Sequence, residues 1–204
     1  ADVYPVKGGT NGDAAMLLGK AMALTPGLRE KLTIVAKTDI IFPNAIDTSK
    51  AYLTQQLEWF LTNLQTDYVD VLLLHFPNSF MSAVEVAETF SEMKVAGKVK
   101  HFGTSNHYIG HRNSLQTQCT KHNITLVTNE IEVSVWNPSY MNYNSDLVDD
   151  SVSQGYRILG WGVLGGDPIG GLNRLFDRHG KRQTKIHHAL KKAGKDLNEE
   201  DETV

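Results

Sequence analysis

The chain has 204 residues, of which 41% are hydrophobic and 21% are charged, and its formal net charge is −3. These values are ordinary for one globular domain, and they give no electrostatic reason to expect a nucleic acid or an anionic membrane as a partner. The single cysteine, Cys119, excludes an internal disulfide and is typical of a reducing compartment, so we expect a cytoplasmic protein. No apolar run reaches the roughly 18–20 residues of a membrane span.

Helical patterns and short apolar segments alternate along the chain. The first helical pattern covers residues 13–23 with Asp13 as its N-cap, and a basic one closes the series at residues 185–195. Apolar residues at helical spacing predict further helices near residues 50–64 and 84–96. A more polar helix is expected at about residues 112–122, and residues 141–153 should be loop and then helix. The short segments between them predict strands. This alternation favours a parallel sheet with right-handed crossovers, in a single domain over residues 1–204.

The clearest strand ends at a histidine. Residues 71–74 read Val-Leu-Leu-Leu, an unbroken apolar run typical of a strand that is covered on both faces. The run stops at His75, and Pro77 then removes a backbone donor and prevents further pairing. A titratable group therefore stands at the carboxyl end of a buried strand, where ligands bind in α/β folds.

Four other predicted strands end in a similar way. The five ends fall at Lys37, His75, Ser105-Asn106, Asn129-Glu130 and Trp161. Because the carboxyl ends of consecutive parallel strands lie on one face, these side chains should converge as in the active site of a (β/α)₈ TIM barrel. Five of the eight strands of such a barrel are visible, so we expect the chain to be incomplete at both ends and part of a longer protein.

Each of these residues also has a purely structural interpretation. Lys37 could be a solvated strand end, His75 a satisfied core histidine, Asn106 and Asn129 turn formers, and Trp161 a core residue. The coincidence of all five at equivalent positions favours a site. The glycine-rich segment 162–171 matches neither a dinucleotide-binding nor a P-loop pattern, and no spacing matches a metal site, so we expect no metal.

Six segments resemble a known family of enzymes. They are ADVY at residues 1–4, IVAK at 34–37, LQTDYVDVLLLH at 64–75, GKVKHFGTSN at 97–106, VTNEIE at 127–132 and GWGVLGG at 160–166. In order and spacing they resemble the aldo-keto reductases, NAD(P)H-dependent carbonyl reductases on a (β/α)₈ barrel, and most closely the bacterial-type oxidoreductase branch. The resemblance covers essentially the whole chain.

The resemblance implies the roles of individual residues. Tyr4, Lys37 and His75 match three members of the family's catalytic tetrad, and its aspartate would lie two residues before Ala1. The implied cofactor-binding residues are Ser105, Asn106, Glu130, Trp161, Gly162, Val163, Leu164 and Gly165. Among them, Glu130 stands where the family usually has glutamine, and Gly162 where many members have serine. The implied cofactor is NADP (NADPH), with NAD as the alternative, and the implied partner is a small-molecule carbonyl compound; the oligomeric state stays open.

The residues themselves suit this chemistry. Hydride transfer to a carbonyl carbon leaves an oxygen that must gain a proton. A tyrosine hydroxyl, with its ordinary pKa of about 10, is a weak donor of that proton. A cation such as Lys37 lowers that pKa, which would make Tyr4 a general acid. His75 can donate a hydrogen bond to the carbonyl oxygen and stabilise the charge that develops there.

Two other functions fit the same sequence less well. The chain could be a catalytically inactive regulatory barrel of this family that binds the cofactor, but such a protein would not need Tyr4, Lys37 and His75 together. It could also be an unrelated barrel isomerase or aldolase that uses Lys37 to form a Schiff base. Trp161 with Ser105-Asn106 favours a nicotinamide over that second alternative.

Overall fold

The computed structural model describes residues 9–41, 45–133 and 146–163. The chain divides into two compact units, of which the first comprises residues 1–130 and 147–159 and the second residues 131–146 and 160–204. Each unit is described by itself below. Tyr4, Leu164, Gly165 and the predicted basic helix lie outside the described residues.

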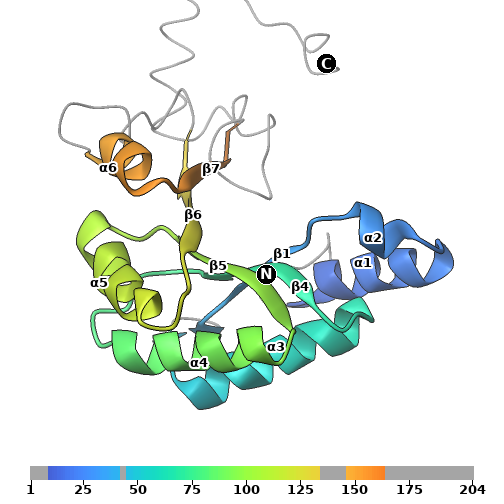
Figure 1. Cartoon of the computed structure of the whole chain (residues 1–204). Coiled ribbons are helices and arrows are strands. Elements are labelled where there is room, and N and C mark those ends of the chain that lie inside the picture. Colours follow the sequence, from blue (N-terminus) through green and yellow to red (C-terminus); the bar gives the residue numbers. More distant parts are fainter. Residues whose placement is uncertain (1–8, 42–44, 134–145, 164–204) are drawn as a thin grey trace, which may run out of the picture. The chain divides into compact units, whose positions relative to one another are not determined.

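A parallel sheet contains all five predicted strands, although the strand predicted to end at Asn129-Glu130 continues to Glu132 (Figure 1). Its strands, in spatial order, are β1 (Val35–Thr38), β4 (Val69–Leu74), β5 (Val99–Ser105), β6 (Leu126–Glu132) and β7 (Arg157–Trp161). Lys37 lies opposite Leu73, and Ser105 lies opposite Glu130. The order follows the chain, as it does in a (β/α)₈ barrel, because each crossover returns the chain to the next position in the sheet.

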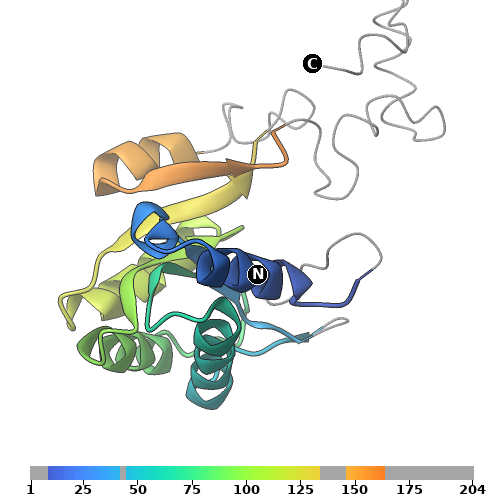
Figure 2. The same ribbon diagram turned by 90° about the vertical axis from the view of Figure 1, so that its right-hand side faces the viewer.

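Helices separate the strands and supply most of the core. They are α1 (Asp13–Leu24), α2 (Leu28–Lys31), α3 (Lys50–Leu64), α4 (Ala83–Val95), α5 (Ile109–Thr120) and α6 (Leu147–Gln154). Helices α3 and α4 lie side by side along the sheet, and α1 packs on α3 (Figures 1 and 2). Phe90 of α4 stacks on Phe102 of β5 with ring centroids 4.2 Å apart, so the two layers meet through aromatic rings.

The structure differs from the sequence prediction at several boundaries. Gly12, with φ of 88°, caps α1, and Asp13 is the first helical residue, so the prediction of Asp13 as N-cap was wrong. Its carboxylate instead accepts hydrogen bonds from the backbone and side chain of Thr10. Helix α5 begins at Ile109, three residues before the predicted start. An antiparallel pair, β2 (Ile40–Ile41) and β3 (Ala45–Ile46), and the short helix α2 were not predicted.

A buried arginine joins α5 to residues 147–159, the second stretch of chain in the first unit. The Cζ atom of Arg112 lies 3.4 Å from the centroid of the Tyr156 ring, and Nη2 donates to the carbonyl of Leu126 over 2.9 Å. The hydroxyl of Tyr156 donates to Asp150 over 2.9 Å. Both Arg112 and Tyr156 are buried, so this cation–π pair acts in a desolvated setting, where it is strong.

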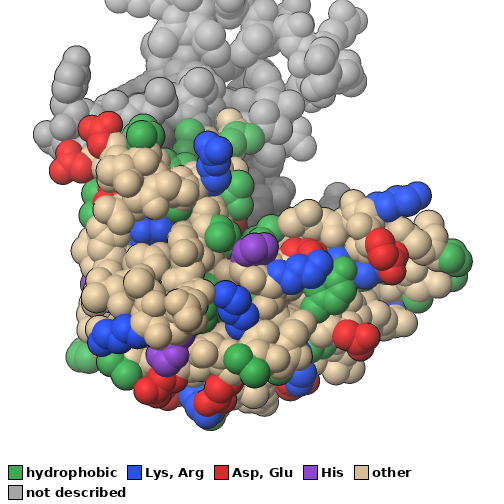
Figure 3. Space-filling view, in the orientation of Figure 1, with side chains coloured by type: hydrophobic (Ala, Val, Ile, Leu, Met, Phe, Trp, Pro, Cys, Tyr) green, Lys and Arg blue, Asp and Glu red, His purple; other side chains and the backbone are tan. Residues whose placement is uncertain are grey.

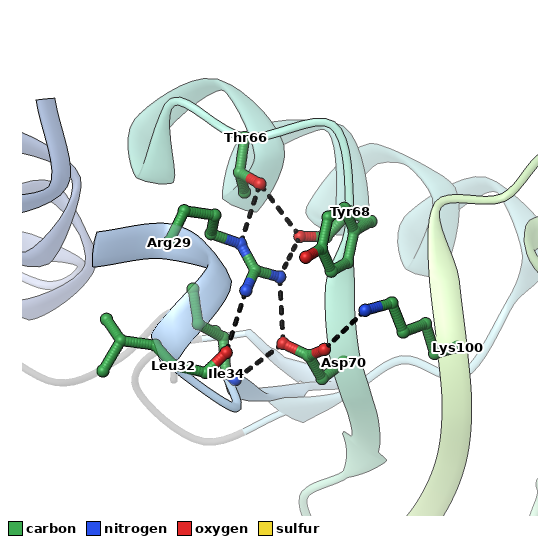
Figure 4. A network of polar contacts seen from close by, with 7 residues as sticks. All are labelled: Arg29, Leu32, Ile34, Thr66, Tyr68, Asp70 and Lys100. Atoms are coloured by element: carbon green, nitrogen blue, oxygen red, sulfur yellow. Dashed lines mark hydrogen bonds and ion pairs between the residues drawn. The ribbon is translucent and has the colours of Figure 1, made fainter. Parts of the chain in front are cut away.

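A second arginine ties the segment before β1 to the amino ends of the strands (Figure 4). Arg29 donates to the hydroxyl of Thr66, to the carbonyls of Leu32 and Tyr68, and to the Asp70 carboxylate over 2.9–3.0 Å. Burial alone would raise the pKa of Asp70, but hydrogen bonds from the Ile34 N–H, Lys100 and Arg29 bring it below its usual value. The network lies at the end of the sheet opposite to the candidate site, where barrels concentrate stabilising contacts.

Charges of both signs are interspersed over the face shown in Figure 3. One exposed pair joins Lys50 of α3 to Glu92 of α4, and another joins Lys98, directly before β5, to Glu58 of α3. Among the helices in the described ranges, none has the length and apolar character needed to cross a bilayer.

Candidate active site

Lys37 at the end of β1 pairs with a carboxylate from β6. Its Nζ atom lies 2.8 Å from Oε1 of Glu130, and both side chains are largely buried. Strands β4 and β5 lie between β1 and β6, so a flat sheet would hold the two backbones about 14 Å apart at the usual strand spacing. Both side chains must therefore reach over the same face of the sheet, and the pair spans the carboxyl ends of four strands.

His75, directly after β4, is buried and uncharged near neutral pH. Burial, and secondarily the positive charge of Lys37, lower its pKa from 6.5 to about 3. Its ring stacks on that of Phe76, with centroids 4.9 Å apart and an interplanar angle of 11°. A neutral imidazole has one ring N–H to donate and one ring nitrogen to accept, so His75 can offer a hydrogen bond to a carbonyl oxygen.

Ser105 ends β5, and Asn106 follows it beside His75. Asn106 has φ of 58°, and its Nδ2 donates to the His75 carbonyl over 3.0 Å and to Oγ of Ser105 over 3.1 Å. Its backbone N–H donates to the Glu130 carbonyl over 2.7 Å. The structure therefore brings together four sequence-predicted residues of the first unit, Lys37 and His75 with Asn106 and Glu130, and buries Ser105 beside them.

These residues fit a nicotinamide carboxamide by their chemistry. A carboxamide has two N–H donors and one carbonyl acceptor, and the hydroxyl of Ser105, the amide of Asn106 and the carboxylate of Glu130 provide acceptors and donors for it. A glutamine at position 130 would add a donor, whereas Glu130 only accepts when it is ionised. Its carboxylate also balances the charge of Lys37, a pairing that the sequence did not indicate.

Asn129 supports the loop that carries Ser105 and Asn106. Its Oδ1 accepts from Thr104 over 3.1 Å and from the His107 N–H over 3.4 Å, while Nδ2 donates to the His107 carbonyl over 2.9 Å. Nδ1 of His107 lies 2.7 Å from the Ser105 carbonyl. Burial lowers the pKa of His107 to about 4 although that carbonyl favours its protonation. The sequence predicted no role for His107, since a polar residue in a loop gives no signal of burial.

Asp39 is a further residue that the sequence did not single out. It follows β1 and is fully buried, and its Oδ2 accepts from the His75 N–H over 2.8 Å. Both of its carboxylate oxygens also lie 3.3 Å from the N–H of Phe76. An aspartate after a strand is ordinarily a turn residue, so only the folded chain reveals these contacts.

The remaining predicted cofactor residues belong to the second unit. Trp161 ends β7, and its carbonyl accepts from the Val133 N–H over 3.1 Å. Gly162 follows with φ of 63°, and Val163 packs near Gly160, whose added Cβ would lie 3.1 Å from a Val163 methyl. The structure does not relate these residues to Lys37 or His75.

Comparisons with known proteins identify the family of the chain and its fold. The model of the Aldo/keto reductase family matches residues 1–202. Oxidoreductase YdhF of Escherichia coli is 36% identical over 87% of the chain, which spans 56% of that protein, and 6-dehydroglucose reductase of Agrobacterium fabrum is 32% identical over 90% of the chain, which spans 63% of it. The solved aldo/keto reductase of Klebsiella pneumoniae, in complex with NADP and acetate, matches this chain with a TM-score of 0.61 at 22% identity. The match covers 89% of this chain and 57% of the Klebsiella chain.

The fold and the family follow from these comparisons. The solved neighbour shares the barrel architecture, and the chain spans 56–63% of the two curated relatives above. The family match extends over nearly every residue, including all five strands of the sheet. The chain therefore belongs to the aldo/keto reductase family, and its described residues form five parallel strands of that family's (β/α)₈ barrel.

Proposed function

We propose that the protein reduces the carbonyl group of a small aldehyde or ketone with NADPH. The observation that carries the proposal is the presence of a buried lysine, Lys37, and a buried, neutral histidine, His75, at the ends of the neighbouring strands β1 and β4. The names of the relatives support it, since one is a reductase and one solved neighbour binds NADP.

Each residue has one task in the proposed reaction. Bound NADPH supplies the hydride. The Tyr4 hydroxyl gives its proton to the carbonyl oxygen, and the Lys37 ammonium favours the phenolate that remains. His75 donates a hydrogen bond to the same oxygen and so orients the substrate. Ser105, Asn106 and Glu130 would hold the carboxamide of the nicotinamide.

The family resemblance implies further cofactor contacts in the second unit. Trp161 would stack on the nicotinamide ring, and the backbone of Gly162, Val163, Leu164 and Gly165 would contact the pyrophosphate.

The test uses the full-length protein and two tyrosine variants. NADPH absorbance is followed with a panel of aldehydes and ketones, and NADPH binding is measured by titration. Tyr4→Phe should lower turnover by about 10²–10⁴-fold with cofactor affinity retained, which is the usual contribution of a general acid. Tyr108→Phe changes an exposed tyrosine at the start of α5 and should leave turnover unchanged.

The same experiment separates the alternatives. NADPH binding without turnover of any carbonyl compound would identify a regulatory barrel. Turnover that Tyr4→Phe does not change would remove Tyr4 from the mechanism. Covalent trapping of a substrate on Lys37 by borohydride, with no need for NADPH, would indicate Schiff-base chemistry instead.

A further inference from the structure

Asp39 has a backbone conformation that few side chains adopt. Its φ is 100°, where residues with a Cβ are strained and glycine is the usual occupant. The turn carries the chain from β1 into the β2–β3 pair, and the Asp39 carbonyl accepts from the N–H of Asp47 over 2.8 Å. A glycine would make this turn without strain, so the turn alone does not account for an aspartate.

The carboxylate of Asp39, like its backbone conformation, is unfavourable in free energy at this position. It is completely buried, and a buried carboxylate is strongly disfavoured unless hydrogen bonds replace its hydration. Its oxygens accept from two consecutive backbone N–H groups, those of His75 and Phe76. Hydrogen bonds to an ionised acceptor are about twice as strong as neutral ones, so this contact holds the backbone firmly.

The peptide group on the other side of His75 is held as well. The His75 carbonyl accepts from Nδ2 of Asn106, and its N–H also faces the Thr38 carbonyl at 2.9 Å. The segment is therefore fixed at both ends by side chains that follow β1 and β5. Because Asp39 holds the backbone of His75 and Phe76 together, it fixes both members of the stacked ring pair.

We propose that Asp39 is a positioning residue for His75. Its carboxylate holds the His75 backbone so that the imidazole keeps one orientation toward the carbonyl oxygen of the substrate. This inference rests on the proposed function for its catalytic effect. Strained residues that persist in a buried place are commonly part of a site, and here the strain coincides with a direct contact to the residue that acts.

The test compares three variants of the full-length protein. Asp39→Gly removes both acceptors and relieves the positive φ, and Asp39→Asn keeps one side-chain oxygen to accept. Gln65→Gly is the matched control, because Gln65 is an exposed residue with φ of 54° at the end of α3, away from the site. Turnover, NADPH affinity and the NMR signals of the labelled His75 imidazole are measured, with His75→Gln to assign the signals.

Asp39→Gly should lower kcat about tenfold to hundredfold, the scale of a misplaced catalytic group, while NADPH affinity stays within about twofold. The His75 imidazole signals should shift in Asp39→Gly and return toward their native positions in Asp39→Asn, which should also recover most of the lost rate. Gln65→Gly should match the wild type in all three measurements.

Several outcomes would overturn the proposal. Imidazole signals of His75 that keep their native positions in Asp39→Gly would do so. Equal losses of kcat in Asp39→Gly and Asp39→Asn would also do so, since the asparagine variant keeps an acceptor oxygen and the glycine variant does not. If Asp39→Gly does not fold, hydrogen exchange in the wild type decides, because the Phe76 N–H must then be protected. A wild-type protein that reduces no carbonyl compound would refute the proposed function, and the imidazole signals would still decide the role of Asp39.

Discussion

Arg29→Ala is expected to destabilise the first unit without touching the candidate site. The substitution removes a guanidinium that donates to Thr66, Leu32, Tyr68 and Asp70 and that lies 3.9 Å above the Tyr68 ring. These contacts join α2 to the amino ends of the strands (Figure 4). Their loss should free the segment before β1.

The magnitude follows from burial and from what remains after the substitution. Breaking a buried ion pair costs about 3–5 kcal/mol, mostly because the partner is left uncompensated. Asp70 would keep the Ile34 N–H at 2.9 Å and the Lys100 ammonium at 3.0 Å, and both side chains of the pair are 13% exposed. We therefore expect the lower end of that range, about 3 kcal/mol.

Urea unfolding of Arg29→Ala, followed by circular dichroism, measures this loss. Lys100→Ala is the matched control, because Lys100 meets the other oxygen of Asp70 from a half-exposed position and should cost far less. The double variant Arg29→Ala with Asp70→Asn should lose less unfolding free energy than the two single variants together, since the two side chains contact each other. Equal losses for Arg29→Ala and Lys100→Ala would refute the reasoning.

Three further predictions concern other parts of the chain. Burial lowers the pKa of His75 to about 3 and of His107 to about 4, so between those values and the ordinary 6.5 the unfolded chain binds more protons. Stability should be fully present above pH 6.5 and fall by roughly 1.4 kcal/mol per pH unit for each histidine as the pH drops toward 4, which urea unfolding across that range checks; a flat profile would contradict it. Gly19→Ala would press a methyl group into the carbonyl of Asn63, so thermal unfolding should show a loss of about 1–3 kcal/mol as α1 moves off α3. Trp161→Ala should weaken NADPH binding about threefold to tenfold, since aromatic stacking contributes about 0.5–1.5 kcal/mol, and unquenched tryptophan emission in the wild type would argue against the stacking.

The sheet could be predicted because its signal is local. Apolar runs such as residues 71–74 end abruptly at polar groups, and α3 and α4 carry their apolar residues at helical spacing. The β2–β3 pair and α2 escaped prediction because two-residue strands and a four-residue helix are too short to show a period.

The site could be predicted only as a set of strand ends. That Lys37 meets Glu130 depends on contacts across 93 positions of sequence, which no local pattern encodes. The contact of Asp39 with His75 depends on a positive φ and on the register of β1 against β4. Family resemblance predicts which residues act, whereas the hydrogen bonds that hold them emerge only from the folded chain.

The arginine between α5 and the returning segment has a consequence for synthesis on the ribosome. Arg112 and Leu126 are made well before Tyr156, yet the guanidinium is buried against the tyrosine ring in the finished unit. Until residues 147–159 emerge, that charge has neither its ring nor the nearby Asp150. The first unit therefore stays unfinished until residues 147–159 have been made, which happens only after residues 131–146 of the second unit.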